Sequence, residues 1–266
     1  MSGLSREMII HPCETLKEIL LDRDMSQQEL AGRTGVTPKH ISTILSGEKN
    51  ITVSFAKKLE YALNIDSEFW INLQNAYDKE LLEFEEVNSI SEQELSIAKH
   101  FREVFEYLVQ EKIIPYCNRL EERVLELRRF LNISNLTAIP ALVSTGAFRA
   151  QTSVTVDEYT LFAWIRICEV LTENIEVETL DSFSQKKTVL EALPILKSFM
   201  FEKSVVFLPL LQEKLAECGI AFCIAPFFKG APVQGFIKNS TSGKVILCMT
   251  FRQKRADIFW FSLFHE

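Results

Sequence analysis

Between residues 12 and 78, apolar residues recur at intervals of three and four positions, in short segments separated by polar breaks. Such a period places the apolar side chains on one face of a helix. In the first segment, Leu16, Ile19 and Leu20 share one face and follow Pro12, a residue favoured at the first position of a helix. The pattern therefore predicts a short first helix with one buried face.

The next two segments carry their own start and stop signals. Ser26 is followed three residues later by Glu29, the capping-box pattern that opens a helix. Gly35 suits the left-handed turn that ends such a helix. Thr37 and Pro38 then provide a cap and a first-turn proline for a third helix. The residues expected to face inward are Leu30, Ala31, Ile41, Ile44 and Leu45.

Two further helices are predicted after Gly47, which closes the third. Thr52 or Ser54 opens the fourth helix, and Asp66 caps the fifth. Their expected inward residues are Phe55, Leu59, Leu63, Phe69, Trp70 and Leu73. Two short helices joined by a tight turn within a five-helix cluster are the arrangement of a helix-turn-helix domain, which we place at residues 1–80.

The polar residues outside this core suit contacts with nucleic acid. No acidic residue occurs from position 37 to 46, and glutamine, serine, threonine and lysine offer partners for base edges and phosphates. We expect base contacts from Gln28, Lys39, Ser42 and Thr43, phosphate contacts from Gln27, Lys49 and Asn50, and further DNA contacts from Thr37 and His40. The alternative is a small helical bundle that merely has a polar third helix.

Several stretches between residues 11 and 78 carry a family resemblance. They read "HPCETL", "SQQELA", "GVTPKHIS", "GEKNIT", "KLEYAL" and "FWINLQNAYD". Together they resemble the Cro/repressor (XRE) type and, more closely, the HigA antitoxin branch. The resemblance implies a five-helix λ-repressor-like domain, a dimer on double-stranded operator DNA, autorepression, and a possible toxin protein partner. Cys13 stands where the family motif usually has glycine, which we expect to affect the turn into the first helix and not the DNA-reading face.

Residues 81–140 are predicted to be a helical linker or dimerisation region. The acidic and polar stretch "KELLEFEEVNSISEQEL", which follows Asp78, marks the boundary before it. Ser91 with Glu94 forms a second capping-box pattern. The following stripe of Leu95, Ala98, Phe101, Phe105 and Leu108 predicts one amphipathic helix. Another helix is expected at about 115–131, with Leu120, Val124, Leu127 and Leu131 inward, and further helices at 157–173, 182–200 and 205–218.

Near Gly219 the pattern changes to short runs rich in β-branched and aromatic residues. "GIAFCIA", "PVQGFIK" and "KVILCMT" predict three strands, and "NSTSG" predicts a hairpin connection between the last two. A helix is expected to begin near Lys254 and to carry Phe259, Trp260, Leu263 and His265. The whole chain is therefore expected to be mainly α-helical, with a small α+β domain and its three-stranded sheet at residues 141–266.

This last region resembles the ImmA/IrrE metallopeptidase-like domain, in its sheet, in "AWIRICE" at 163–169 and in the final "WFSLFHE". In the family motif H-E-x-x-H, two histidines four positions apart bind zinc and the glutamate acts as general base. This sequence has only the first half, His265 and Glu266. The resemblance therefore implies a domain truncated by design, by cleavage or by a natural stop. We expect no catalytic residue, metal site or cofactor, and interpret "WFSLFHE" as a packing element.

The composition of the chain further limits the classes of protein to which it can belong. The net charge is −7, and residues 1–80 hold nine Lys/Arg and twelve Asp/Glu, a balance of −3, so DNA binding has to come from local placement of side chains. The six cysteines form no C-x-x-C pair, no run of about 18 apolar residues suggests a membrane span, and no signal peptide is visible, so a cytoplasmic protein is expected. We expect a sequence-specific DNA-binding regulator and not an enzyme. The alternatives are a zinc-dependent endopeptidase in a longer form and a protein-interaction module whose helix-turn-helix no longer reads DNA.

Overall fold

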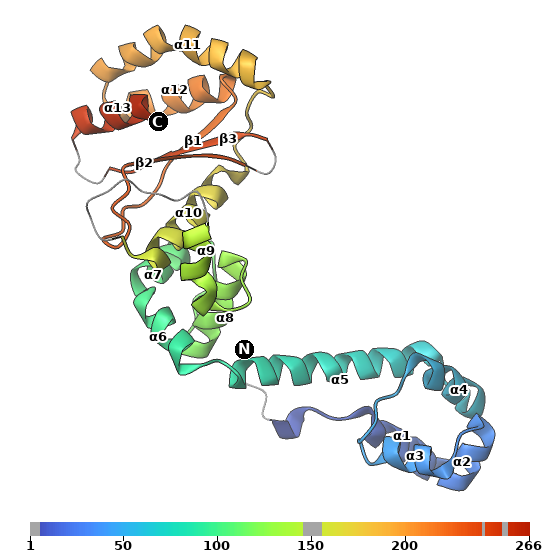
Figure 1. Cartoon of the computed structure of the whole chain (residues 1–266). Helices are drawn as coiled ribbons and strands as arrows, with labels where there is room; N and C mark the ends of the chain where they lie inside the picture. The colour runs from blue at the N-terminus through green and yellow to red at the C-terminus, as the bar shows by residue number, and fades with distance from the viewer. Residues whose placement is uncertain (1–5, 146–155, 241–242, 252–254) are drawn as a thin grey trace. The chain divides into compact units, whose positions relative to one another are not determined.

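The computed structural model describes residues 6–145, 156–240, 243–251 and 255–266. The described residues are mainly helical and contain one sheet of three strands, as the sequence predicts (Figure 1). They form thirteen α-helices. The chain divides into two compact units, Met1–Ile90 and Ser91–Glu266. In the part of the chain that is described, no helix is long and apolar enough to cross a membrane.

The helices of the first unit begin and end at the residues that carry capping signals. The hydroxyl of Ser26 accepts the N–H of Glu29 at 3.1 Å, and that of Thr37 accepts the N–H of His40 at 3.2 Å. Gly35 ends the second helix with a φ of 64°. The elements are η1 Arg6–Met8, α1 Pro12–Asp22, α2 Gln27–Thr34, α3 Pro38–Leu45, α4 Val53–Leu63 and α5 Ser67–Asn88. The five predicted helices are confirmed.

The starts of α4 and α5 also follow side-chain caps. Thr52 is the cap of α4, because its hydroxyl accepts the N–H of Phe55 at 3.2 Å, and Ser54 lies inside the first turn. Asp66 caps α5 by accepting the N–H of Glu68 at 2.7 Å. The helix α5 continues to Asn88, so position 80 falls inside it. The division of the chain into three domains stays a prediction.

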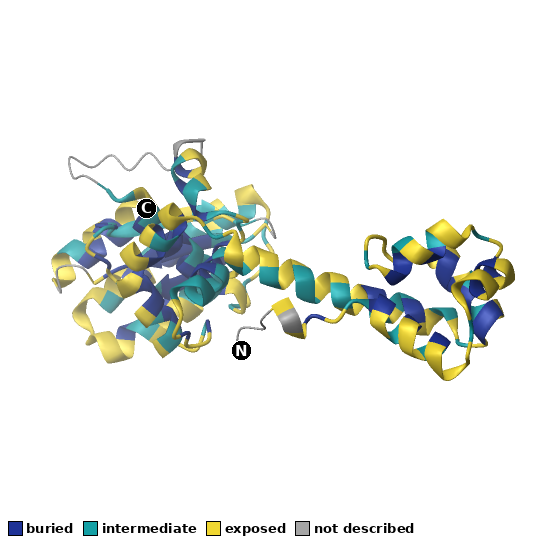
Figure 2. Cartoon of the chain, turned by 90° about the horizontal axis from the view of Figure 1, so that it is seen from below, coloured by how far each residue is buried: buried dark blue, intermediate teal, exposed yellow. Residues whose placement is uncertain are grey.

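One apolar cluster joins all five helices of the first unit (Figure 2). Each helix contributes at least one side chain with no solvent exposure, among them Leu16, Leu30, Ile41, Leu59 and Trp70. Burying such a side chain contributes about 1.5–3 kcal/mol. The relative placement of α2 and α3 is therefore fixed by shared burial, and not by the polar residues on their outer faces.

The prediction that Phe69 faces inward is wrong. Its side chain is 44% exposed, and its ring lies edge-on to Trp70 with 5.2 Å between the centroids. The buried residues of α5 are Trp70 and Gln74, while Leu73 is half-buried. The reason is helical period: positions four apart share a face, so the stripe that starts at Trp70 continues to Gln74 and leaves Phe69 at its edge.

The second unit begins with two helices where one was predicted. The stripe from Leu95 to Leu108 falls on α6 Glu92–His100 and α7 Arg102–Gln110. Phe101 joins them with a ψ of 11°, which takes its backbone out of the helical range while its ring is fully buried. The next helix starts at Leu120 and not near 115. The remaining elements are α8 Leu120–Leu131, η2 Leu136–Ala138, α9 Ile139–Thr145, α10 Glu158–Glu173, α11 Ser182–Ser198, η3 Phe199–Phe201 and α12 Ser204–Glu217.

The capping box predicted at Ser91 and Glu94 forms only in part. Ser91 accepts the N–H of Glu94 at 3.2 Å, but the Glu94 carboxylate turns into the core. It accepts hydrogen bonds from Arg128 at 3.0 and 2.7 Å and from the N–H of Leu136 at 3.0 Å. Burial alone raises the pKa of Glu94, but these hydrogen bonds outweigh it and the pKa lies below its usual value. A buried ion pair therefore ties α6 to α8 and η2.

The sheet has its last strand in the middle. The strands β1 Ile220–Ile224, β2 Gly235–Asn239 and β3 Val245–Met249 lie in the order β1-β3-β2. The predicted hairpin is confirmed, since β2 and β3 pair antiparallel with Phe236 opposite Cys248. Residues 241–242 of its connection lie outside the described residues. Strand β1 pairs with β3 in parallel, with Cys223 opposite Cys248.

Helices cover both faces of this sheet, with α11, α12 and α13 on one face and α10 on the other (Figure 1). The helix α13 spans Ala256–His265, and Lys254, where it was expected to begin, lies outside the described residues. Phe259, Trp260 and Leu263 are buried, and the Trp260 ring lies 5.0 Å from that of Phe207. The helix that ends in "WFSLFHE" thus packs its apolar residues against the sheet and α12.

Candidate nucleic-acid interface

The candidate interface is built on α2, the turn at Gly35 and α3. Both the N–H of Gly35 and the N–H of Val36 donate to the carbonyl of Ala31, the latter at 3.1 Å, which closes the end of α2. Leu30 and Ile41 belong to the same buried cluster, so the two helices cannot rotate independently. The outer faces of α2 and α3 are therefore presented by a rigid scaffold.

The outer face of α3 exposes some candidate residues more than others. Lys39 and Ser42 are exposed, whereas His40 and Thr43 are half-buried. The His40 ring lies edge-on to Phe55, with 5.4 Å between the centroids. The Thr43 hydroxyl donates to the carbonyl of His40 at 2.9 Å, which leaves its oxygen free to accept. The side chains of Lys39 and Ser42 are thus accessible to a ligand, whereas those of His40 and Thr43 are only partly accessible.

The start of α2 contributes two glutamines. Gln27 and Gln28 occupy its first turn and are both exposed. Thr37 is also exposed, but its oxygen already accepts the N–H of His40 as the cap of α3. Its O–H group can still donate, since a hydroxyl acts as donor and acceptor at once. These side chains offer polar groups on the same two helices as Lys39 and Ser42.

The loop after α3 is folded back against the end of that helix. The N–H groups of Glu48 and Lys49 both donate to the carbonyl of Thr43, at 3.0 and 3.1 Å. Lys49 is exposed. Asn50 is exposed as well, but its amide donates to the carboxylate of Asp78 at 3.4 Å. The structure therefore places Lys49 beside the end of α3, with Asn50 partly engaged by α5.

Two positioning residues on α5 were missed by the sequence reasoning. The side chain of Gln74 accepts the N–H of Ile51 at 2.9 Å and donates to Asp78 at 2.8 Å. These bonds tie the loop after α3 to α5. The available signal was the four-residue spacing from Trp70, which puts Gln74 on the inward stripe, where a buried amide has to find partners.

The turn at Gly47 also contacts the start of α1. Its φ is 76°, a left-handed conformation that favours glycine, and a Cβ built there would stand 3.7 Å from the sulfur of Cys13. Cys13 is buried in the first turn of α1, so this unusual residue packs against the turn that follows α3. Burial raises the pKa of the Cys13 thiol, which keeps it neutral.

The charges around the interface are locally favourable for an anion. Glu29, on α2, pairs with Arg33 at 2.7 Å. Burial lowers the pKa of His11 by more than Asn50 and Asp78 raise it, so that imidazole is neutral at pH 7. Lys39 and Lys49 are the candidate residues with a permanent positive charge. The positive charge of this face is therefore small and concentrated at α3 and its following loop.

The two residues that match half of the zinc motif lie far along the second unit. His265 and Glu266 are both exposed at the end of α13, and the His265 ring stacks on Phe261 with 6.4 Å between the centroids. Within the described ranges, no group of three or more His, Cys, Asp or Glu side chains is placed to hold a metal ion. The expected absence of a metal site and of enzyme activity stays a prediction.

Known proteins resemble the region that carries this interface. The helix-turn-helix family model matches residues 16–70. Virulence-associated protein I of Dichelobacter nodosus is 32% identical over 83 residues, which cover 31% of this chain and 77% of that protein. The chain belongs to the helix-turn-helix family. A second relative, the uncharacterized HTH-type transcriptional regulator YddM of Escherichia coli K12, is 30% identical over 66 residues, 25% of this chain and 70% of the relative.

A solved structure is similar over a comparable part of the chain. It is described as an addiction module antidote protein of a HigA family from Coxiella burnetii, and is 26% identical with a TM-score of 0.26. The match covers 40% of this chain and 97% of that one. The family match ends at residue 70, within α5. The ImmA/IrrE resemblance of residues 141–266 stays a prediction.

Proposed function

We propose that the helix-turn-helix unit, Met1–Ile90, binds double-stranded operator DNA in a sequence-specific way, and that the chain is an antitoxin-like transcriptional regulator. The observation that carries the proposal is the exposed, acid-free face of α3, held by shared burial beside α2 in a unit of the helix-turn-helix family. The description of the relative YddM as a transcriptional regulator supports it.

In this proposal α3 enters the major groove, which is about 12 Å wide and admits one helix. Lys39 and Ser42 are exposed polar residues of that helix and contact base edges, with Thr43 contributing its acceptor oxygen. Gln28 reaches the bases from the start of α2. Gln27, Lys49 and Asn50 contact the phosphates on either side, with Thr37 and His40 at the border, and so set the position of α3 along the duplex.

The binding is expected to depend only weakly on salt. Each neutralised phosphate contributes about 0.9 to the slope of log affinity against log salt. Because few permanent cations lie on this face, we expect a slope of roughly 2–5 for a dimer. A slope near 10 would contradict the proposed interface, since it would require basic residues elsewhere in the chain.

The proposal includes a homodimer that represses its own promoter. One recognition helix reads only a few base pairs, and this fold binds paired half-sites about 34 Å apart. The apolar stripes of residues 91–131, in the predicted linker or dimerisation region, are buried within their own unit at residues such as Leu108 and Val124. Sedimentation at micromolar concentration tests the dimer, and a monomer with full operator affinity would contradict it.

The decisive experiment measures fluorescence anisotropy of a duplex from the protein's own promoter at a stated salt concentration. Lys39→Ala and Ser42→Ala are each expected to weaken binding by about 1–3 kcal/mol and to relax sequence preference at one position. Lys79→Ala is the matched control, because Lys79 is 77% exposed on α5, is not one of the residues assigned to the interface, and its loss removes the same charge. Unchanged operator affinity in the first two variants would contradict the assignment of Lys39 and Ser42 to base contacts.

The resemblance of residues 11–78 to the HigA branch supports a second partner, a toxin protein. A toxin gene beside an antitoxin gene is the arrangement that this resemblance implies. Co-expression of the chain with the product of its neighbouring gene is expected to give a stable complex on size-exclusion chromatography. Separate elution of the two proteins, with DNA binding retained, would remove the toxin partner and leave the regulator.

A further inference from the structure

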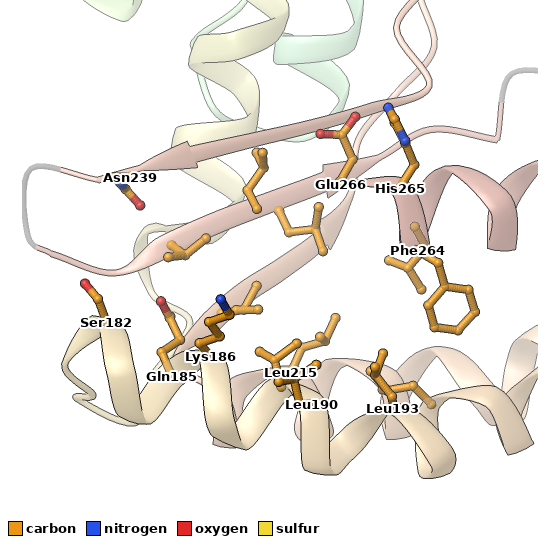
Figure 3. A pocket seen from close by; sticks show the side chains of 17 residues that line it. Ser182, Gln185, Lys186, Leu190, Leu193, Leu215, Asn239, Phe264, His265 and Glu266 are labelled. Carbon is orange, nitrogen blue, oxygen red and sulfur yellow. The ribbon is translucent and has the colours of Figure 1, made fainter.

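A cavity of about 540 Å³ lies between α11 and the sheet, beside the end of α13 (Figure 3). Most of the side chains that line it are aliphatic, and they come from separate elements: Val189 and Leu193 from α11, Ile237 from β2, Val245 from β3 and Leu263 from α13. Its volume falls within the range of about 300–1,000 Å³ that small-molecule sites occupy. The cavity therefore has the size and lining of a site for an apolar small molecule.

The polar side chains of the cavity gather at its two ends (Figure 3). Ser182, Gln185 and Lys186, from the first turns of α11, lie near Asn239 of β2 at one end. His265 and Glu266 lie at the other end. Aliphatic residues fill the space between the two groups, so the lining suits a molecule with a polar head and an apolar body.

The two ends differ in charge. The Lys186 ammonium forms no ion pair with any described residue, whereas the adjacent Lys187 lies 3.9 Å from Glu191. Asp181 precedes the lining residue Ser182 but does not itself line the cavity, and its carboxylate accepts the N–H of Ser184 at 2.7 Å at the start of α11. Glu266 places a negative charge at the opposite end. An anionic head is therefore attracted to the end with Lys186 and repelled from the end with Glu266.

We propose that this cavity binds a medium-chain alkanoate, with its carboxylate at Lys186 and its alkyl chain running over Val189 and Leu193 toward Phe264. The distance from Lys186 to Leu193 along α11 is about 10 Å at 1.5 Å per residue, which an extended alkyl chain of that class spans. Burial of the alkyl chain supplies affinity, and the single cation sets the orientation. The site belongs to the second unit, so the proposal stands apart from the DNA-binding function.

Calorimetric titration of the full chain with hexanoate, octanoate and decanoate tests the apolar part of the proposal. Each added methylene is expected to tighten binding about fourfold. Leu193→Gln, a substitution at a half-buried lining position, is expected to weaken decanoate binding at least tenfold and to leave the circular dichroism spectrum unchanged. Absence of binding at millimolar decanoate, or an affinity that does not depend on chain length, would overturn the proposal.

A pair of neighbouring lysines tests the head group. Lys186→Gln is expected to weaken decanoate binding about two- to fivefold and to leave the binding of uncharged 1-decanol unchanged. Lys187→Gln removes the same charge one position away from the lining and is expected to change neither. Equal effects of the two lysine substitutions would overturn the assigned orientation. If decanoate fails to bind and Leu193→Gln instead converts a dimer to a monomer, the face contacts a second copy and the proposal is wrong.

Discussion

The two units differ in how their helices begin. In the helix-turn-helix unit, all five α-helices start at a side chain that accepts a backbone N–H, namely His11, Ser26, Thr37, Thr52 and Asp66. Among the described residues of the second unit, α7, α12 and α13 start without such a bond. The first unit is therefore specified by signals within one turn of chain, and the second depends more on packing between distant elements.

The buried polar groups show the same contrast. The first unit buries the neutral amide of Gln74, which finds its partners on the loop after α3 and on its own helix. The second unit buries a charged pair, Glu94 and Arg128, from two different helices. Removing one partner of a buried ion pair strongly destabilises a protein, because the remaining charge stays buried without a compensating charge. The second unit is thus more sensitive to single changes at positions that no local signal marks.

The largest expected loss of stability tests whether the hydrophobic core of each unit stabilises that unit alone. Trp260 is 2% exposed, and Trp260→Ala is expected to destabilise the second unit by about 3–5 kcal/mol. Urea denaturation followed by circular dichroism measures the loss, and operator affinity is expected to stay unchanged. Trp70→Ala, at a site with no exposure in the first unit, is expected to abolish operator binding instead. Loss of operator binding in both variants would contradict the contrast between the units.

The buried ion pair gives the next effect. Glu94→Gln is expected to cost about 3 kcal/mol, since it leaves the Arg128 guanidinium without this carboxylate in a site where Glu94 is 1% exposed. Glu106→Gln is the control, because its pair with Arg102 is exposed and solvent screens the attraction between the two charges, so a much smaller loss is expected. The two free energies of unfolding are compared at pH 7, and equal losses would contradict the assigned role.

The same pair predicts a dependence on pH. The pKa of Glu94 is lowered in the folded protein from its usual 4.5, so the stability from its charge is complete above that value. It is lost as the pH falls below 4.5 through the folded pKa. Glu94→Gln removes this contribution, so the variant is expected to lose less stability than the parent chain between pH 5 and the acid limit. Parallel pH profiles of the two proteins would contradict the role of Glu94.

A smaller effect tests the local signals of the first unit. Thr52→Ala is expected to cost about 1 kcal/mol, because its hydroxyl accepts the N–H of Phe55 at the start of α4. Ser54→Ala, two residues later and inside the helix, is expected to stay within about 0.5 kcal/mol of the parent. Thermal unfolding of both variants measures the difference. A larger loss of stability in Ser54→Ala than in Thr52→Ala would mean that Ser54 is the cap.

The smallest expected effect tests whether an added capping residue stabilises a helix of the second unit. Lys203 precedes α12 with a φ of −71° and a ψ of 148°, the extended backbone of a cap, but its side chain makes no cap bond within the described part of the chain. Lys203→Ser is expected to stabilise by about 0.5–1 kcal/mol, and Lys203→Ala is not. An equal gain from both substitutions would mean that removal of the charge, and not capping, is the cause.

Sequence by itself determined the features whose causes lie within a few residues of one another. Ser26, Gly35 and Thr37 mark the ends of α2 and α3, and the structure places them as caps and turn. The helices near 157–173, 182–200 and 205–218 and the hairpin of β2 and β3 also follow from periodicity and turn residues. These interactions act over one helical turn or one strand connection, so the order of residues contains them. The nine DNA-contact residues are also predicted from the sequence, and their contacts with DNA remain predictions.

Tertiary structure alone decided the features that depend on partners far apart in the chain. Glu94 meets Arg128 across 34 positions, which a local capping pattern does not reveal. The break at Phe101 accompanies the burial of its ring, and the side chain of Gln74 finds its partner, the N–H of Ile51, 23 positions away in the chain. The last strand lies at the centre of the sheet because β1 and β2 both pair with it. Each of these outcomes depends on which surfaces meet when the chain folds, and periodicity along the sequence does not record that choice.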